Sequence, residues 1–134
     1  MLTGIDPLLT GTLLRYLDGM GHGDTVAVCD AHFPANRLVS AVVEIPGATA
    51  VDVVRAIVSV LPLDRPTAAT LMDPQGADAP AFALLRDGLP VEPAAIETVG
   101  RYEFYAQARQ AAVAVRTGET RVFGNALLRK GVVR

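Results

Sequence analysis

The sequence predicts an α/β protein in which helices cover both faces of one central sheet. Segments with the period of amphipathic helices alternate with short extended segments along the chain. Several extended segments are apolar on both faces, which is typical of a sheet buried on both sides. No internal repeat, low-complexity stretch or linker divides the 134 residues. We therefore expect a single domain over residues 1–134.

The first half of the chain is expected to begin with a helix and two strands. Thr10 can cap a helix that ends near Gly19, because the leucines between them recur at helical spacing. Residues 25–29 are apolar and partly β-branched, which predicts a buried strand. A loop over 30–36 and a second strand over 41–45, stopped by a Pro-Gly pair, follow.

A second helix, a strand and a turn are expected next. Thr49 and Asp52 resemble a capping box, and an apolar stripe then continues to Pro62, which ends the helix. Residues 68–72 predict a strand, and 73–76 a turn.

The last third begins with a helix for which Asp78 is the expected cap. Pro80 suits its first turn and Gly88 its end. The remaining segments are expected to be extended over 95–99, helical over 102–110, extended over 111–116 and, after a turn at 117–119, extended around 122–123.

Composition excludes several classes of protein. About half of the residues (51%) are apolar, but no run approaches the ~20 that cross a bilayer, and no signal peptide is apparent. We therefore expect a soluble cytoplasmic protein. The net charge of −2, without a basic stripe, argues against nucleic acid as a partner. Cys29 lies in an apolar strand, so we expect a small buried hydrophobe rather than a reactive thiol, and no ligands for structural zinc are present.

The most informative segment runs from Met20 to Ala35. It places His22 between two glycines, and Asp30 where the strand over 25–29 ends. We expect this segment to deliver the histidine and the acid to one place. An imidazole beside a carboxylate can move protons near neutral pH.

The wider pattern resembles the L-fucose mutarotase and D-ribose pyranase family. The similarity is carried by four blocks spread over the whole chain. The first block is Met1 to Leu9, and the second pairs the turn Met20 to Asp24 with the segment Asp30 to Pro34. The third is Arg101-Tyr102-Glu103-Phe104-Tyr105, and the fourth is Thr117-Gly118-Glu119 with Phe123-Gly124-Asn125 and the tail to Val132. The segment Asp30 to Pro34 and the Arg101 block are more similar to the fucose branch.

The resemblance implies a fold, an assembly and a reaction. It implies an α/β/α sandwich with a central mixed sheet and a ring-like homo-oligomer, often a decamer in this family. The implied reaction interconverts sugar anomers: the ring opens to an aldehyde and closes on the other face. This requires one proton delivered to the ring oxygen and one withdrawn from the anomeric hydroxyl, so we expect no metal and no cofactor.

Two residues are the expected catalytic pair. His22 would supply or accept a proton, although a histidine in a glycine-rich turn can also be a solvated loop residue. Asp30 would orient the imidazole or accept hydrogen bonds from the sugar, but its carboxylate can equally cap the turn that follows it. His32 either walls the pocket or has a structural role.

Four further residues are expected to bind substrate. Arg101 matches the family's sugar-contacting arginine, although a surface arginine paired with a carboxylate is an alternative. Asn125 offers a donor and an acceptor, and Gly124 permits close approach of a ligand, whereas a tight turn is the plainer explanation for both. Phe123 departs from the family, because relatives commonly have tyrosine there. Tyr102, Phe104 and Tyr105 could stack on a sugar face, but aromatic residues at this spacing more often pack in the core, which is the role expected for Phe104.

The sequence thus predicts an isomerase that interconverts the α and β anomers of L-fucose or a similar monosaccharide. A D-ribose pyranase needs the same ring-opening protons and is the alternative enzyme. A sugar-binding or regulatory protein with weakened turnover is the alternative from a different class, and Phe123 is the feature that favours it.

Overall fold

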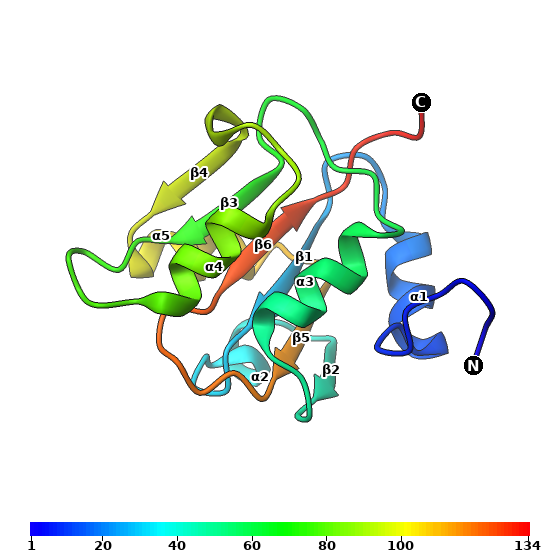
Figure 1. Ribbon diagram of the computed structural model, residues 1–134, viewed down its shortest axis with the longest axis horizontal. Helices are drawn as coiled ribbons and strands as arrows, with labels where there is room; N and C mark the ends of the chain where they lie inside the picture. Colours follow the sequence, from blue (N-terminus) through cyan, green and yellow to red (C-terminus); the bar gives the residue numbers. More distant parts are fainter.

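The central layer is a six-stranded mixed sheet with the order β2-β5-β1-β6-β3-β4 in this computed structural model of residues 1–134 (Figure 1). The strands are β1 (Thr25–Cys29), β2 (Val42–Ile45), β3 (Ala69–Met72), β4 (Ile96–Val99), β5 (Val113–Thr117) and β6 (Ala126–Arg129). Strands β1 to β5 share one direction, and β6 lies antiparallel between β1 and β3. The predicted mixed sheet is confirmed.

Helices cover both faces of the sheet. They are α1 (Gly11–Gly19), α2 (Ala35–Leu38), α3 (Ala50–Val58), α4 (Pro80–Gly88) and α5 (Arg101–Ala108), with a 3₁₀ turn, η1, over Pro93–Ala95. Helices α1, α3 and α4 share a core with Val26 and Val28, whereas α2 and α5 share the opposite core with Ala27 and Cys29. In Figure 1, α3 and α4 lie in front of the sheet and α5 lies behind it. Alternate residues of one buried strand therefore enter two different cores.

Side-chain caps that the sequence predicts set the starts of α1 and α3. The Thr10 hydroxyl accepts a hydrogen bond from the Leu13 N–H, and the Thr49 hydroxyl accepts one from the Asp52 N–H. Both predicted caps are thus confirmed. Cys29 is buried, as expected, and burial raises the pKa of its thiol. No helix has both the length and the apolar character to cross a membrane.

Three local predictions are wrong. Asp78 does not cap α4, because the cap position falls one residue later, on Ala79, which makes no side-chain cap bond. The segment expected as loop over 30–36 already contains the start of α2. Residues 122–123 are not extended: Phe123 has φ +60°, and the last strand starts only at Ala126. A left-handed residue cannot continue a strand.

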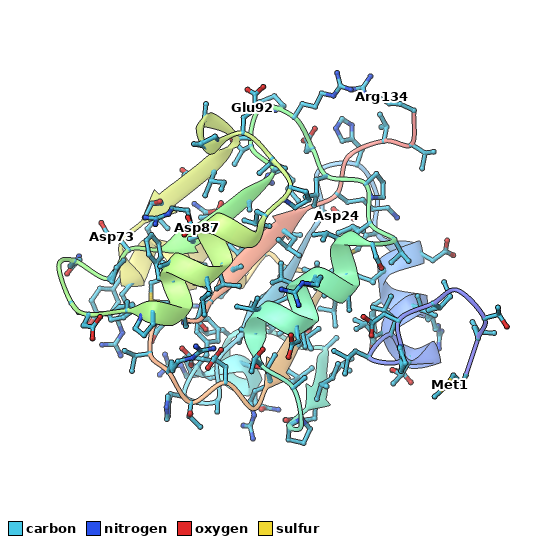
Figure 2. The ribbon with its side chains drawn as sticks, in the orientation of Figure 1. Met1, Asp24, Asp73, Asp87, Glu92 and Arg134 are labelled. Carbon is cyan, nitrogen blue, oxygen red and sulfur yellow. The ribbon has the colours of Figure 1, made fainter.

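The strand directions give the sheet two different edges. The carboxyl edge holds the ends of β1 to β5 and the start of β6, and the amino edge holds the opposite ends. Figure 2 shows the separation, because Asp73 follows β3 on one side while Asp24 and Glu92 precede β1 and β4 on the other.

Candidate functional site

Asp30 lies at the carboxyl edge within a nearly closed hydrogen-bond network. Its Oδ2 accepts from the Asn125 Nδ2 at 3.0 Å and from the Gly124 N–H at 3.3 Å. The Asp30 N–H in turn donates to the Asn125 Oδ1 at 2.9 Å. Asp30 and Asn125 are each only 3% exposed. The structure thus brings together three of the residues that the sequence singled out, from opposite ends of the chain.

The network also contains the turn cap that was the alternative role of Asp30. Its Oδ1 accepts from the His32 N–H at 3.0 Å, which closes a turn over three residues. Burial raises the pKa of Asp30, and the hydrogen bonds from His32 and Gly124 act in the opposite direction. The carboxyl group is therefore fixed in direction and only slightly exposed to water.

His32 has a structural contact rather than a free ring. Its Nε2 lies 3.0 Å from the Thr120 carbonyl oxygen, to which it can donate. This contact ties the loop after β1 to the loop that precedes β6.

The second loop of the site runs from Glu119 to Asn125. Phe123 holds φ +60°, a conformation that costs a bulky residue ~1–3 kcal/mol and persists only where its surroundings impose it. A Cβ on Gly124 would lie 2.9 Å from the Cγ of Glu119, so only glycine fits there without a shift. The backbone of the loop is therefore constrained at Phe123 and Gly124.

Glu119 anchors this loop. Its side chain is 3% exposed and forms a two-pronged ion pair with Arg121, with Nε–Oε2 and Nη2–Oε1 distances of 2.9 Å. The hydrogen bonds from Arg121 lower the pKa of Glu119. Glu119 was not singled out from the sequence as a residue with its own role, because nothing local indicates that its carboxylate is buried.

Arg101 lies at the start of α5, against an aromatic group. Its Nε donates to the Tyr105 hydroxyl at 3.0 Å, and its guanidinium lies 5.4 Å from the Tyr105 ring centre. The Tyr105 ring packs edge-on against Phe33, with centroids 5.4 Å apart. The alternative pairing with a carboxylate is absent, since no carboxylate lies within 4.0 Å of this guanidinium. Phe104 is fully buried, as predicted, whereas Tyr102 is 77% exposed.

His22 lies at the amino edge, in a loop that is held from several sides. Gly23 has φ +91°, and its N–H donates to the Lys130 carbonyl oxygen at 2.8 Å. The ammonium group of Lys130 donates to the carbonyl oxygens of Leu17 and Met20, at 2.7 Å each. The loop is therefore fixed by the end of α1 and by the residue that follows β6.

The imidazole itself has one side-chain partner. Its Nε2 lies 3.3 Å from Oδ1 of Asp64, and the side chains of His22 and Asp64 are 62% and 22% exposed. Hydrogen bonds from the Arg65 N–H, first, and from His22 lower the pKa of Asp64. The pair forms because the loops before β1 and β3 reach the same edge. Asp64 was missed, since it is 42 positions from His22 and no motif marks it.

One expectation needs correction: a single chain does not bring His22 and Asp30 to one place. His22 precedes β1 and Asp30 follows it. The five residues of this strand alone span about 17 Å. The two residues lie at opposite edges of the sheet, and one monosaccharide cannot touch both within one chain.

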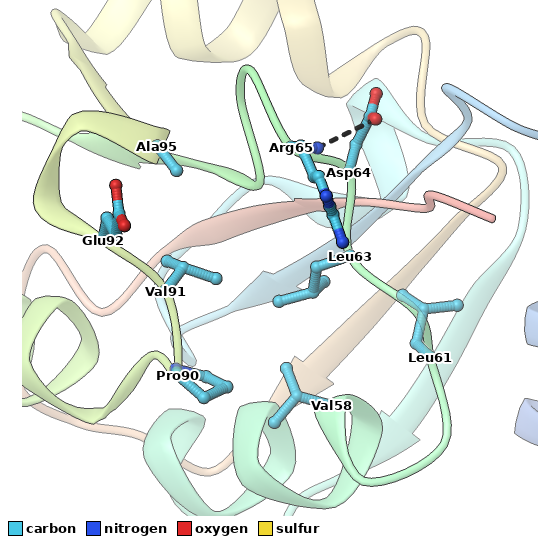
Figure 3. Close-up of a pocket in the computed structure, with 9 residues that line it drawn as sticks. All are labelled: Val58, Leu61, Leu63, Asp64, Arg65, Pro90, Val91, Glu92 and Ala95. Atoms are coloured by element: carbon cyan, nitrogen blue, oxygen red, sulfur yellow. Dashed lines mark hydrogen bonds between the residues drawn. The ribbon is translucent and has the colours of Figure 1, made fainter. Parts of the chain in front are cut away.

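One cavity lies on the amino edge. It has a volume of about 550 Å³ and an apolar wall that includes Val58, Leu63 and Val91 (Figure 3). Asp64 lies at its border and directs its carboxylate away from that wall, toward the N–H of Arg65. Asp30 lines none of the five main cavities of the chain.

Comparison with known families identifies one family that matches nearly the whole chain. The model of the RbsD / FucU transport protein family matches residues 3–133. The chain belongs to this family. The resemblance noted in the sequence is thereby confirmed over nearly its whole length.

Solved structures give the same picture. Fucose mutarotase from Streptococcus pneumoniae, in complex with L-fucose, is 28% identical with a TM-score of 0.91, covering 99% of this chain and 100% of that one. Atu2016, described as a putative sugar binding protein, is 35% identical with a TM-score of 0.91, covering 100% and 97%. Bacillus subtilis RbsD complexed with D-ribose, at 21% identity and TM-score 0.82, covers 100% of both chains and shows the fold alone.

The Glu119–Arg121 pair predicts a pH-dependent stability. Because the pKa of Glu119 is lowered from its ordinary value of 4.5, its contribution is complete above pH 4.5 and is lost as the pH falls through the lowered value. Urea unfolding of Glu119→Gln should show a loss of about 1–3 kcal/mol near pH 7. This difference from the unaltered chain should shrink below pH 4.5. A difference that stays constant down to pH 3, well below the ordinary range of a glutamate, would contradict the assignment.

Proposed function

We propose that the chain is a mutarotase that interconverts the anomers of an aldose, with L-fucose as the first sugar to test. The observation that carries the proposal is the fixed Asp30–Asn125–Gly124 network at one edge together with the His22–Asp64 pair at the other. The chain is similar over nearly its full length to a fucose mutarotase in complex with L-fucose, and this similarity supports the proposal.

The reaction moves two protons and breaks one bond. Opening removes the proton of the anomeric hydroxyl, protonates the ring oxygen and cleaves the bond between that oxygen and the anomeric carbon. Closing reverses these steps after rotation, so that the ring hydroxyl adds to the other face of the aldehyde. The reaction needs only a proton donor and a proton acceptor, and each such group contributes about 10²–10⁴-fold to the rate.

The contacts of His22 suit this role. If Nε2–H donates to Asp64, the proton-free Nδ1 is available as a base, and the carboxylate stabilises the imidazolium that forms. Asp30 presents a fixed carboxylate that can accept hydrogen bonds from sugar hydroxyls, and the Arg101 guanidinium supplies donors.

The two edges must meet for both groups to act on one sugar. Since β1 separates His22 from Asp30 within a chain, we propose that His22 and Asp64 of one copy face Asp30 of a neighbouring copy. Exposed apolar side chains at both edges, such as Val122 near one and Val60 near the other, favour such a contact. This accounts for the expected homo-oligomer.

Phe123 supports a second candidate, a sugar-binding protein with weak turnover. Its ring keeps an apolar wall but lacks the hydroxyl of the tyrosine that relatives commonly have there, which can bond the sugar or help the proton exchange. The similarity to Atu2016, described as a putative sugar binding protein, is compatible with this function. A binding protein and a mutarotase differ in one measurable property, the rate of anomer exchange relative to the affinity for the sugar.

The central test is His22→Ala, measured by exchange NMR on L-fucose, D-ribose and related aldoses. We expect anomer exchange to fall by at least ~10²-fold, since the general acid or base is removed. Stability should hardly change, because the side chain is 62% exposed. Equal exchange rates for the two proteins at matched buffer would exclude His22 as the catalytic group.

A mixing experiment tests the two-copy site. Coexpressed His22→Ala and Asp30→Asn chains should regain about a quarter of the activity per site, because in random assembly that fraction of contacts joins an intact His22 to an intact Asp30. Each variant alone should be nearly inactive. Light scattering that shows a monomer at micromolar concentration, or a mixture as inactive as its parents, would rule out the shared site.

The third prediction concerns Phe123→Tyr. Phenylalanine and tyrosine share a ring, so packing is kept while a hydroxyl is added beside Gly124. One net hydrogen bond of ~0.5–1.5 kcal/mol, formed only in the transition state, raises turnover roughly two- to twelve-fold. Slower exchange on every aldose tested would instead mean that the pocket fits an apolar edge of its sugar.

A further inference from the structure

We infer that Glu119 is a positioning residue of the candidate site, whose buried carboxylate fixes the loop that holds Gly124 and Asn125 against Asp30. The inference rests on the proposed function in one respect only, the reaction that the positioned loop would serve. The contacts that carry it belong to the chain itself.

The carboxylate of Glu119 holds its own loop and lies near the start of a helix. It accepts two hydrogen bonds from the Arg121 guanidinium at 2.9 Å and one from the Arg121 N–H at 3.3 Å. The N–H of Ala50, the first residue of the nine-residue helix α3, also lowers the pKa of this carboxylate, so the group lies near the start of that helix. A carboxylate at a helix N-terminus satisfies a free N–H and interacts favourably with the helix dipole. Glu119 thus fixes the loop through contacts that do not belong to the sheet.

The backbone of Glu119 connects the same residue to Asp30. Its N–H donates to the Thr117 hydroxyl at 3.2 Å, and that hydroxyl donates to the Cys29 carbonyl oxygen at 2.7 Å. Its carbonyl oxygen accepts from the Ala31 N–H at 2.8 Å. The residues on both sides of Asp30 are therefore bonded to Glu119 or to its immediate partner.

The side-chain stem of Glu119 shapes the far end of the loop. The close approach of its Cγ to Gly124 leaves no room for a side chain at that position. Phe123 is held in a left-handed conformation directly before it. Strand β5 ends at Thr117, and strand β6 begins only at Ala126. The residues between the two strands are therefore not fixed by pairing within the sheet. Together with the His32–Thr120 contact, Glu119 and its partners hold the loop where Gly124 and Asn125 reach Asp30.

The test compares Glu119→Gln with a matched control, Glu44→Gln. The control removes the carboxylate of Glu44, which forms an exposed ion pair with Arg116 at 3.1 Å between the adjacent strands β2 and β5. Two readouts are needed. One is the hydrogen-exchange protection of the Gly124 N–H and the Asn125 side-chain amide, by NMR. The other is the dissociation constant of L-fucose and the anomer exchange rate.

We expect Glu119→Gln to lose about tenfold in the protection of both amides and about tenfold in affinity for the sugar, while Glu44→Gln matches the unaltered chain. Protection and affinity that are unchanged in Glu119→Gln would overturn the inference, as would equal losses in the control. If Glu119→Gln does not fold, Arg121→Gln, which leaves Glu119 in place and removes its partner, must show the same loss of protection.

The two proposals fail in different ways. If the unaltered chain neither binds nor exchanges any aldose, the proposed function is wrong, but amide protection still decides whether Glu119 positions the loop. If sugar exchange is observed and the protection of Gly124 and Asn125 does not depend on Glu119, the positioning role is wrong while the proposed function stands.

Discussion

The antiparallel insertion of β6 between β1 and β3 is the constraint on which the rest of the site depends. All other strands run in one direction, so their carboxyl ends lie along one edge, and β6 alone begins at that edge. The loop before β6 therefore returns to the end of β1, where Asn125 and Asp30 exchange hydrogen bonds across 95 positions of sequence. A parallel last strand would have placed Asn125 at the opposite edge.

Local signals predicted most of the fold for a physical reason. The caps at Thr10 and Thr49 act through the N–H groups of residues three positions later, and buried strands such as 25–29 carry their apolar character in sequence. The errors fall where tertiary contacts decide. Val122 and Phe123 have strand-like side chains, but the packing of Glu119 against Gly124 and the left-handed turn at Phe123 end any extended run there.

The candidate site could be predicted in its parts but not in its arrangement. Family-like motifs marked Asp30, Gly124 and Asn125, and the structure places the three in hydrogen-bond contact. Their role in binding a sugar stays a prediction. The separation of His22 from Asp30 follows from the length of β1, but their nearness in sequence concealed it. Asp64 and Glu119 act through partners or burial that depend on strand order, and a single sequence does not reveal strand order.

The two halves of the site differ in how completely one chain forms them. At the carboxyl edge, Asp30 is buried among donors, so its geometry is fixed before any ligand or partner arrives. At the amino edge, His22 is largely exposed and its contact with Asp64 is weakened by water. In the proposed assembly, a neighbouring copy would exclude water from this pair and strengthen the contact, because charges interact more strongly at lower dielectric. Assembly would then supply the strength of the acid–base group as well as its position, which couples the oligomeric state to the rate of proton transfer.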